Sequence, residues 1–214
     1  MNLRLRVPGD PWLYAFARAL LVTAVRIYGR FYVSGAANLP ATGPAIVVAN
    51  HPSDVDPILI GVALPRTVHF MADLVQFRRG FVGPIIERLA AFPIHKGEPD
   101  RAALERALGL LAAGEVVVLF AEGDLYRRAD PTAFHSGVAF LAVRSGAPVV
   151  PAAIVGAEGI WSDCRVHWPW VRVNVGQPVS FNGARRGRAA YACMAEELRV
   201  AVIRLHDDRS PHVC

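Results

Sequence analysis

The amino-acid sequence predicts a single α/β domain, built on a mixed, largely parallel β-sheet with helices on both faces. Short apolar runs rich in β-branched residues, such as 45–49 and 115–120, are typical of strands that are buried on both faces. Between these runs, apolar residues recur at helical spacing, as at Leu104, Leu108 and Leu111. Helices that alternate with strands favour a parallel sheet. A chain of 214 residues is long enough to bury one substantial core.

The expected elements follow this alternation along the chain. Gly114 should end the helix 100–113, because glycine readily takes the left-handed conformation at a helix C-terminus. In 171–175 valines alternate with Arg172 and Asn174, a pattern typical of a half-exposed or edge strand. We expect strands at 30–34, 45–49, 67–71, 92–94, 115–120, 148–155 and 171–175, and helices at 55–63, 83–90, 100–113, 134–145 and 194–205.

Residues 1–32 are expected to form an amphipathic segment at a membrane interface. Three arginines interrupt its apolar stretch, whereas a membrane-spanning helix needs about 20 predominantly apolar residues. At helical spacing these arginines share one side, opposite an apolar side, as in helices that lie in the interface plane. An ordinary amphipathic helix packed on the domain is the alternative. The basic positions are Arg18, Arg26 and Arg30, the apolar ones are Phe16, Leu20 and Ile27, and the aromatic anchors are Trp12, Tyr14 and Tyr28.

Composition and charge indicate an anionic membrane surface as a partner. The net charge is +5 and 53% of the residues are hydrophobic, with an isoelectric point near 9.6 and a mean hydropathy of +0.31. No dense basic run or nucleic-acid module is recognisable, so we expect no nucleic-acid partner. The three widely spaced cysteines indicate a reducing compartment, without a disulfide framework or a zinc site. We expect no signal peptide and a peripheral or monotopic protein on the cytoplasmic face of the membrane.

A histidine follows the expected strand 45–49 almost directly, with two carboxylates close behind it in the segment Asn-His-Pro-Ser-Asp-Val-Asp-Pro. Histidine is well suited to move a proton near neutral pH. A carboxylate such as Asp56 could hold His51 in one tautomer and stabilise its protonated form. The alternative is a surface loop histidine followed by aspartates that only cap a helix.

The spacing sets a geometric condition on this pair. On a continuous helix Asp56 would lie about 140° around the axis from His51, too far for contact. His51 must therefore lie in a loop, which Pro52 favours because proline disfavours helical geometry in the preceding residue. Ser53 or Asp54 would then cap the following helix, with a cap as the first role expected of Asp54.

The spacing of His51 and Asp56 resembles the His-x4-Asp box of the glycerolipid acyltransferase family, which includes 1-acylglycerol-3-phosphate acyltransferases. Three more segments resemble family blocks in the same order: Phe-Pro-Ile-His-Lys-Gly at 92–97, Leu-Phe-Ala-Glu-Gly at 119–123 and Val-Val-Pro-Ala-Ala-Ile at 149–154. The chain departs from the family at Lys96, where arginine is usual, and at Asp124 and Leu125, which replace Thr-Arg.

The resemblance implies transfer of an acyl group from acyl-coenzyme A or acyl carrier protein to a lysophospholipid, with 1-acyl-sn-glycerol-3-phosphate as the default acceptor. His51 would deprotonate the acceptor hydroxyl and Asp56 would orient His51, with no metal or other cofactor. Residues 33–206 would form the acyltransferase domain and 207–214 a frayed tail. Backbone N–H groups at the start of the helix 55–63 are candidates for stabilising the oxyanion.

The same resemblance implies where the acceptor binds. Lys96 with Arg127 or Arg128 would bind its phosphate, and Gly123 would let the backbone approach closely. Glu122 would fix the substrate or anchor an arginine, or it could form a purely structural ion pair. The departures in these blocks leave two alternatives open: another alcohol acceptor, such as a lyso-ornithine lipid or a glycolipid, or a non-catalytic lipid-binding protein.

Overall fold

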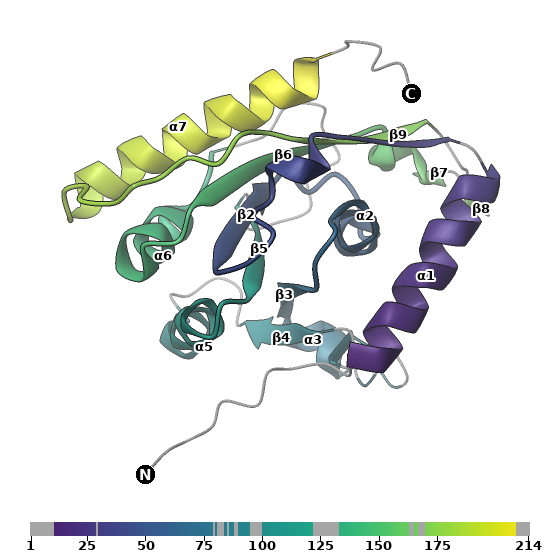
Figure 1. Ribbon diagram of the computed structural model, residues 1–214, viewed down its shortest axis with the longest axis horizontal. Helices are drawn as coiled ribbons and strands as arrows, with labels where there is room; N and C mark the ends of the chain where they lie inside the picture. Colours follow the sequence, from purple (N-terminus) through teal and green to yellow (C-terminus); the bar gives the residue numbers. More distant parts are fainter. Residues whose placement is uncertain are drawn as a thin grey trace.

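A seven-stranded sheet forms the centre of the computed structural model, which describes residues 11–28, 30–78, 80, 84, 86–87, 90–94, 100–121, 133–162, 165–166 and 170–208. The strands of the sheet are β1 (Phe31–Ser34), β2 (Ala45–Ala49), β3 (Val68–Asp73), β4 (Ala91–Ile94), β5 (Val116–Phe120), β6 (Val149–Val155) and β9 (Val171–Val175). Their order is β1-β9-β6-β2-β5-β3-β4 (Figure 1). Only β6 and β9 pair antiparallel; the other neighbours are parallel. The predicted mixed, largely parallel sheet is therefore confirmed.

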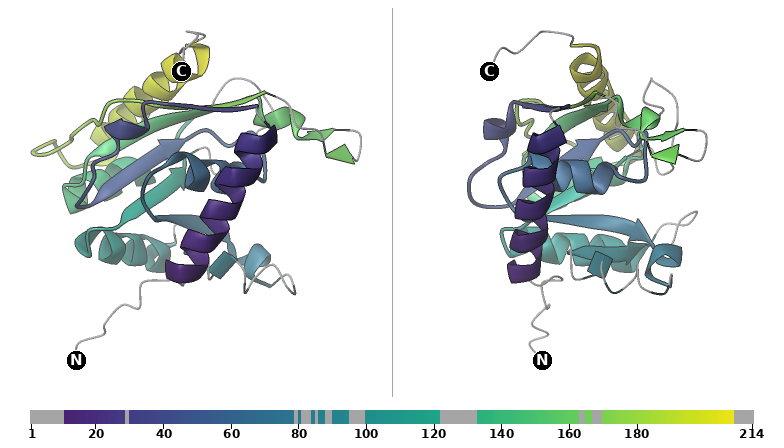
Figure 2. Two further views of the ribbon diagram at one scale, coloured as in Figure 1. Left: turned by 45° about the vertical axis from the view of Figure 1, so that its right-hand side comes forward. Right: turned by 90° about the vertical axis from the view of Figure 1, so that its right-hand side faces the viewer.

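Helices cover both faces of this sheet. The helices are α1 (Pro11–Tyr28), α2 (Asp56–Ala63), α3 (Leu74–Phe77), α5 (Arg101–Ala112), α6 (Gly137–Ser145) and α7 (Arg188–Asp207). Figures 1 and 2 show α5, α6 and α7 side by side on one face and α1 with α2 on the other. A small hairpin of β7 (Trp161–Ser162) and β8 (Arg165–Val166) lies outside the main sheet. The predicted helix 83–90 falls largely outside the described residues.

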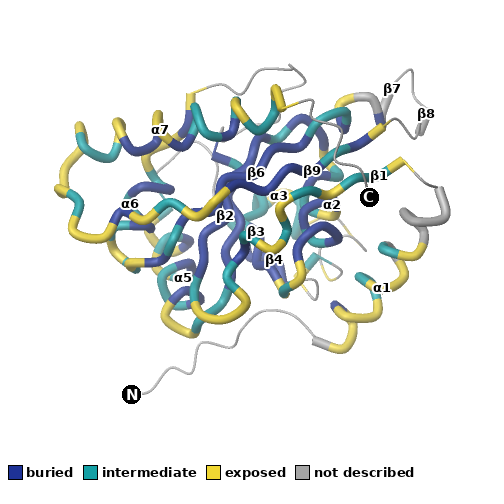
Figure 3. The backbone as a smooth tube through the Cα atoms, turned by 45° about the horizontal axis from the view of Figure 1, so that its top comes forward, coloured by how far each residue is buried: buried dark blue, intermediate teal, exposed yellow. Residues whose placement is uncertain are grey.

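The two faces enclose separate apolar clusters. Every residue of β2 is buried, and the central strands form the dark interior of Figure 3. Successive side chains of β2 point to opposite faces of the sheet. Val47 packs in the cluster beneath α2, and Val48 packs in the cluster beneath α5, α6 and α7. Full burial of such a side chain contributes about 1.5–3 kcal/mol. Because both faces of the central strands are buried, nearly every residue in them is apolar, and their sequences are continuous apolar runs.

The prediction of a half-exposed or edge strand at 171–175 is wrong, because β9 lies inside the sheet between β1 and β6. Its polar side chains have internal partners. The buried Asn174 accepts from Ser34 Oγ at 2.7 Å and donates to the Leu205 carbonyl at 2.7 Å. Arg172 donates to the Asp208 carbonyl at 3.0 Å. Polar residues at alternate positions of β9 therefore attach the C-terminal end of α7 to the sheet.

Helix α1 has one side on the domain and the other in solvent. Tyr14 is buried, so its expected role as an interfacial anchor is wrong, and its hydroxyl accepts from the Val68 N–H at 3.3 Å. Burial raises the pKa of Tyr14. Arg18 donates to carbonyl groups near the C-terminus of α2. On the opposite side Trp12, Phe16 and Leu20 are 85%, 68% and 61% exposed. Across the described helices, none combines the length and apolarity needed to cross a bilayer.

Candidate active site

The side chain of Asn50 sets the point at which the chain leaves the sheet. The ladder between β2 and β6 ends at the pair Ala49 and Ala152. Beyond it, the Asn50 amide binds both backbone groups of Ile154: Oδ1 accepts from the N–H at 2.7 Å and Nδ2 donates to the carbonyl at 2.8 Å. Asn50 is buried, so this double hydrogen bond is shielded from water. It anchors the end of β2 while the following residues turn into a loop.

The expected pair of His51 and Asp56 is formed across this loop. His51 Nδ1 lies 2.8 Å from Asp56 Oδ2, and the Ser53 N–H donates to the same oxygen at 2.7 Å. Helix α2 begins at Asp56, so His51 lies outside it, as the spacing requires. The expected N-cap is wrong, because Val55 occupies that position without a side-chain cap and Asp54 is exposed. The Asp56 carboxylate instead closes the turn by accepting a hydrogen bond from the backbone N–H of Ser53, three residues earlier.

Burial and hydrogen bonding act in opposite directions on Asp56. Its side chain is fully buried, and burial raises the pKa of the carboxyl against the hydrogen bonds from His51 and Ser53, which lower it. Among the described residues, Oδ1 has no hydrogen-bond partner. A carboxylate accepts hydrogen bonds, so the ionised Asp56 directs the proton of the imidazole to Nδ1 and leaves Nε2 free to act as a base. A positive imidazolium would also relieve the buried negative charge.

The imidazole of His51 lies against an aromatic ring as well. Its centroid is 4.2 Å from that of Phe120, and the two planes differ by 19°. Phe120 ends β5 and pairs in register with Ala49 of β2. The sequence reasoning assigned no role to Phe120 or to the amide of Asn50. Phe120 lies in the block 119–123 that resembles the family, and Asn50 directly precedes His51, but neither position indicated its contact with another strand.

Most backbone donors at the start of α2 are already paired, which restricts the expected oxyanion site. The Asp56 N–H donates to the Ser53 carbonyl at 3.1 Å, and the N–H groups of Ile58 and Leu59 donate to the Val55 carbonyl at 2.9 and 3.1 Å. Pro57 has no N–H. The donors of Asp56, Ile58 and Leu59 are therefore occupied within the turn and are not left over for an oxyanion.

The expected phosphate-binding residues lie outside the described residues, so their contacts remain predictions. They follow β4 and β5 in the chain, which end at Ile94 and Phe120. Because β2, β5, β3 and β4 run parallel, the ends of these strands meet at the edge of the sheet where His51 lies. The residues concerned are Lys96, Glu122, Gly123, Arg127 and Arg128.

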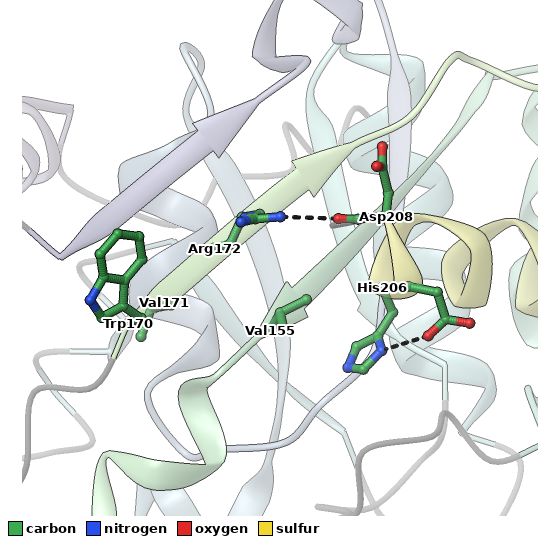
Figure 4. A pocket seen from close by; sticks show the side chains of 7 residues that line it. Val155, Trp170, Val171, Arg172, His206 and Asp208 are labelled. Atoms are coloured by element: carbon green, nitrogen blue, oxygen red, sulfur yellow. Dashed lines mark hydrogen bonds and ion pairs between the residues drawn. The ribbon is translucent and has the colours of Figure 1, made fainter. Parts of the chain in front are cut away.

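A separate pocket of about 220 Å³ lies between the end of β6, the start of β9 and the end of α7 (Figure 4). Its polar groups pair with one another: Arg172 with the Asp208 carbonyl, and His206 Nδ1 with Asp207 Oδ1 at 3.4 Å. His51 and Asp56 do not line it. Within the described part of the chain, no three His, Cys, Asp or Glu side chains gather as metal ligands, and Cys193 is an exposed free thiol.

The family model described as Acyltransferase matches residues 30–155, more than half of the chain. The protein therefore belongs to this family and is an acyltransferase. The matched region contains all four sequence blocks, including the one with His51 and Asp56.

Two named relatives agree with this assignment, and a solved structure shares the fold. The chain is 30% identical over 145 residues to the 1-acyl-sn-glycerol-3-phosphate acyltransferase of Bacillus subtilis. The aligned region covers 67% of this chain and 72% of that protein. It is 28% identical over 159 residues to the chloroplastic enzyme LPAT1 of Arabidopsis thaliana, covering 71% of this chain but only 44% of the plant protein. The crystal structure of the acyltransferase PlsC from Thermotoga maritima matches with a TM-score of 0.69 at 24% identity, covering 93% and 80% of the two chains. That match shows the shared fold.

Proposed function

We propose that this acyltransferase moves a fatty acyl group from an acyl thioester to the hydroxyl of 1-acyl-sn-glycerol-3-phosphate, in phospholipid biosynthesis. The contact of 2.8 Å between His51 and Asp56 carries the proposal, because it supplies an oriented base at the end of a central strand. The names of the bacterial and plant relatives support the choice of acceptor. The thioester could come from acyl-coenzyme A or from acyl carrier protein.

The reaction needs one proton to move twice. His51 Nε2 takes the proton of the acceptor hydroxyl while the oxygen attacks the thioester carbonyl carbon. The tetrahedral intermediate collapses by breaking the carbon–sulfur bond, and the imidazolium returns the proton to the departing thiolate. The products are an ester and a free thiol. Asp56 holds His51 in the reactive tautomer and offsets the charge on the imidazolium, and the thioester needs no metal ion for activation.

Acceptor recognition is proposed for the residues that follow β4 and β5. Lys96 with Arg127 or Arg128 would bind the phosphate, Gly123 would allow close backbone approach, and Glu122 would orient the acceptor or an arginine. Lys96→Ala and Arg127→Ala should each raise the KM for a phosphate-bearing acceptor, because they remove ground-state binding. The KM for the acyl donor is the internal control. An unchanged acceptor KM in both variants would remove these residues from the phosphate site.

A second acceptor class has its own support in the sequence. Asp124 and Leu125 stand where the family has Thr-Arg, so the sequence of the proposed phosphate site departs from the family pattern. A thiol-release assay with purified protein should separate the candidates, using acyl-coenzyme A or acyl carrier protein with 1-acylglycerol-3-phosphate, lyso-ornithine lipid or a glycolipid. Thiol release with 1-acylglycerol-3-phosphate supports the proposed acceptor. Release only with another acceptor would show that this other molecule is the substrate.

We also propose that α1 holds the enzyme at the cytoplasmic face of the membrane as a peripheral or monotopic protein. The exposed side chains of Trp12, Phe16 and Leu20 lie opposite the side that packs on α2, so they are available to an acyl-chain boundary. The double variant Trp12→Ser, Phe16→Ser should lower partitioning into anionic liposomes at least about tenfold, since each side chain loses more than 1 kcal/mol of burial. Val33→Ser, another exposed apolar site, is the control. Equal binding of all three proteins would reject this attachment.

A further inference from the structure

We propose that Phe120 is a positioning residue for His51, one whose aromatic face orients the imidazole and favours the imidazolium formed during acyl transfer. The inference rests on the proposed role of His51 as the base. It begins with the near-parallel stacking of the two rings, 4.2 Å apart between centroids and 19° apart in plane.

The position of Phe120 is itself determined by the sheet. Phe120 is the last residue of β5, beside the end of β2, and its ring also stacks on Phe70 of β3, with centroids 6.4 Å apart and planes within 7°. Phe70 is buried in the cluster beneath α2. Phe70 of β3, Phe120 of β5 and His51, in the loop just after β2, thus form a row of nearly parallel rings, with His51 at the partly exposed end. The row extends from the rigid core to the reacting group.

The hydrogen bond to Asp56 cannot orient the imidazole alone. It holds Nδ1 near one point, but the side-chain torsions still let the ring swing about the axis from Cα to Nδ1, which would displace Nε2. The face of Phe120 blocks that swing on one side and defines the plane of the ring. A misplacement of the reacting atom by about 1 Å can lower the rate by a factor of about 100, so a contact that fixes the plane of the imidazole should increase the rate.

The aromatic face also distinguishes between the two charge states of His51. The face carries partial negative charge, so it attracts an imidazolium more than a neutral imidazole. The imidazolium exists only after the acceptor hydroxyl is deprotonated, so this attraction is stronger in the transition state than in the ground state. Phe120 should therefore affect kcat, with little effect on the KM of either substrate.

Phe120→Leu tests the proposal, because leucine keeps an apolar side chain of similar depth and removes the ring. We expect kcat to fall about three- to thirtyfold, from the range known for cation–aromatic contacts, with both KM values within about twofold of wild type. The acid side of the profile of kcat/KM against pH should move to lower pH. Phe120→Tyr restores the ring and should restore kcat and the pH profile.

Two controls separate this role from packing and from the proposed function. Phe181→Leu makes the same change at a buried phenylalanine in the opposite cluster and should lower the melting temperature without changing kcat per folded molecule. If Phe120→Leu has the same effect as Phe181→Leu, or if Phe120→Tyr does not restore kcat, the positioning role is wrong. If His51→Ala keeps wild-type activity, the proposed base itself fails, whatever Phe120 does.

Discussion

Two histidines, one just past the end of β2 and the other within β3, each lie beside a carboxylate but differ in their exposure to solvent. His51 lies just beyond the end of β2, 17% of its side chain is exposed, and Nδ1 is 2.8 Å from Asp56. His69 lies within β3 opposite Val117 of β5, its side chain is 1% exposed, and Nε2 is 3.5 Å from Glu115. Within the described residues, neither ring nitrogen of His69 makes a well-formed hydrogen bond.

The surroundings of His69 keep it neutral. Burial lowers the pKa of His69, the nearby carboxylate of Glu115 opposes this shift, and the positive charge of Arg106 on α5 adds to it. No substrate can reach a ring enclosed in the sheet. A nearby carboxylate is thus insufficient to make a histidine a candidate base; the ring must also be accessible, as that of His51 is and that of His69 is not.

The largest expected effect concerns His51. His51→Ala should reduce acyl transfer by about 10² to 10⁴, the usual contribution of a general base, while the protein stays folded and its liposome binding stays unchanged. His69→Met is the matched control, because it removes the other histidine of the comparison and should leave kcat per folded molecule unchanged. Activity of His51→Ala near that of wild type would contradict the contrast between the two residues.

Asp56→Asn should give the next largest loss of activity. The amide can still accept the Ser53 N–H, but it carries no charge to stabilise an imidazolium and no longer favours the proton on Nδ1. We expect kcat to fall by about 100-fold or more, with KM values preserved. A fall confined to KM would mean that Asp56 serves binding instead.

Asn50→Ala tests whether His51 depends on the fixed end of β2, because Asn50 attaches that end to β6. Loss of both hydrogen bonds to Ile154 leaves its backbone groups unsatisfied, so the free energy of unfolding should fall by about 1–3 kcal/mol, and kcat should also fall. Asn174→Ala removes two hydrogen bonds of a buried asparagine on β9. It should destabilise the fold similarly without lowering kcat per folded molecule. Equal kcat in the two variants would show that the two hydrogen bonds from Asn50 to Ile154 do not position the base.

The smallest effect is the pH dependence that His69 adds to stability. Its pKa in the folded protein lies below the ordinary value of 6.5, so as the pH falls through that value the unfolded chain takes up a proton that the folded chain refuses. Stability is therefore lost from about pH 6.5 downward, toward the depressed pKa. Urea unfolding at pH 7.5 and 5.5 should show a smaller loss in His69→Met, by about 1 kcal/mol.

The opposite shift at Asp56 does not confuse this measurement. Burial raises the pKa of Asp56, so acidification relieves a cost in the folded state. That contribution is present in both wild type and His69→Met, and it cancels in their difference. Identical pH dependence in the two proteins would show that His69 is not the titrating group.

Local signals in the sequence were sufficient for much of the fold. The β-branched runs located β2 and β5, and Asp100 begins α5 by accepting the Ala103 N–H at 2.9 Å, within one residue of the expected start. The predictions for Tyr14, for an edge strand at β9 and for the cap of α2 were wrong. Each depended on a partner from another part of the chain, such as the N–H of Val68 for Tyr14.

The sequence by itself determined the alternation of strands and helices, and it determined that His51 must stand outside a helix to reach Asp56. These features depend on residues close together in the chain, where backbone geometry leaves few choices. Only the tertiary structure decided that β5 lies beside β2, so that Phe120 stacks on the imidazole, and that His69 is enclosed while His51 is partly exposed. Strand neighbours and burial arise from packing between distant segments, and no local pattern encodes them.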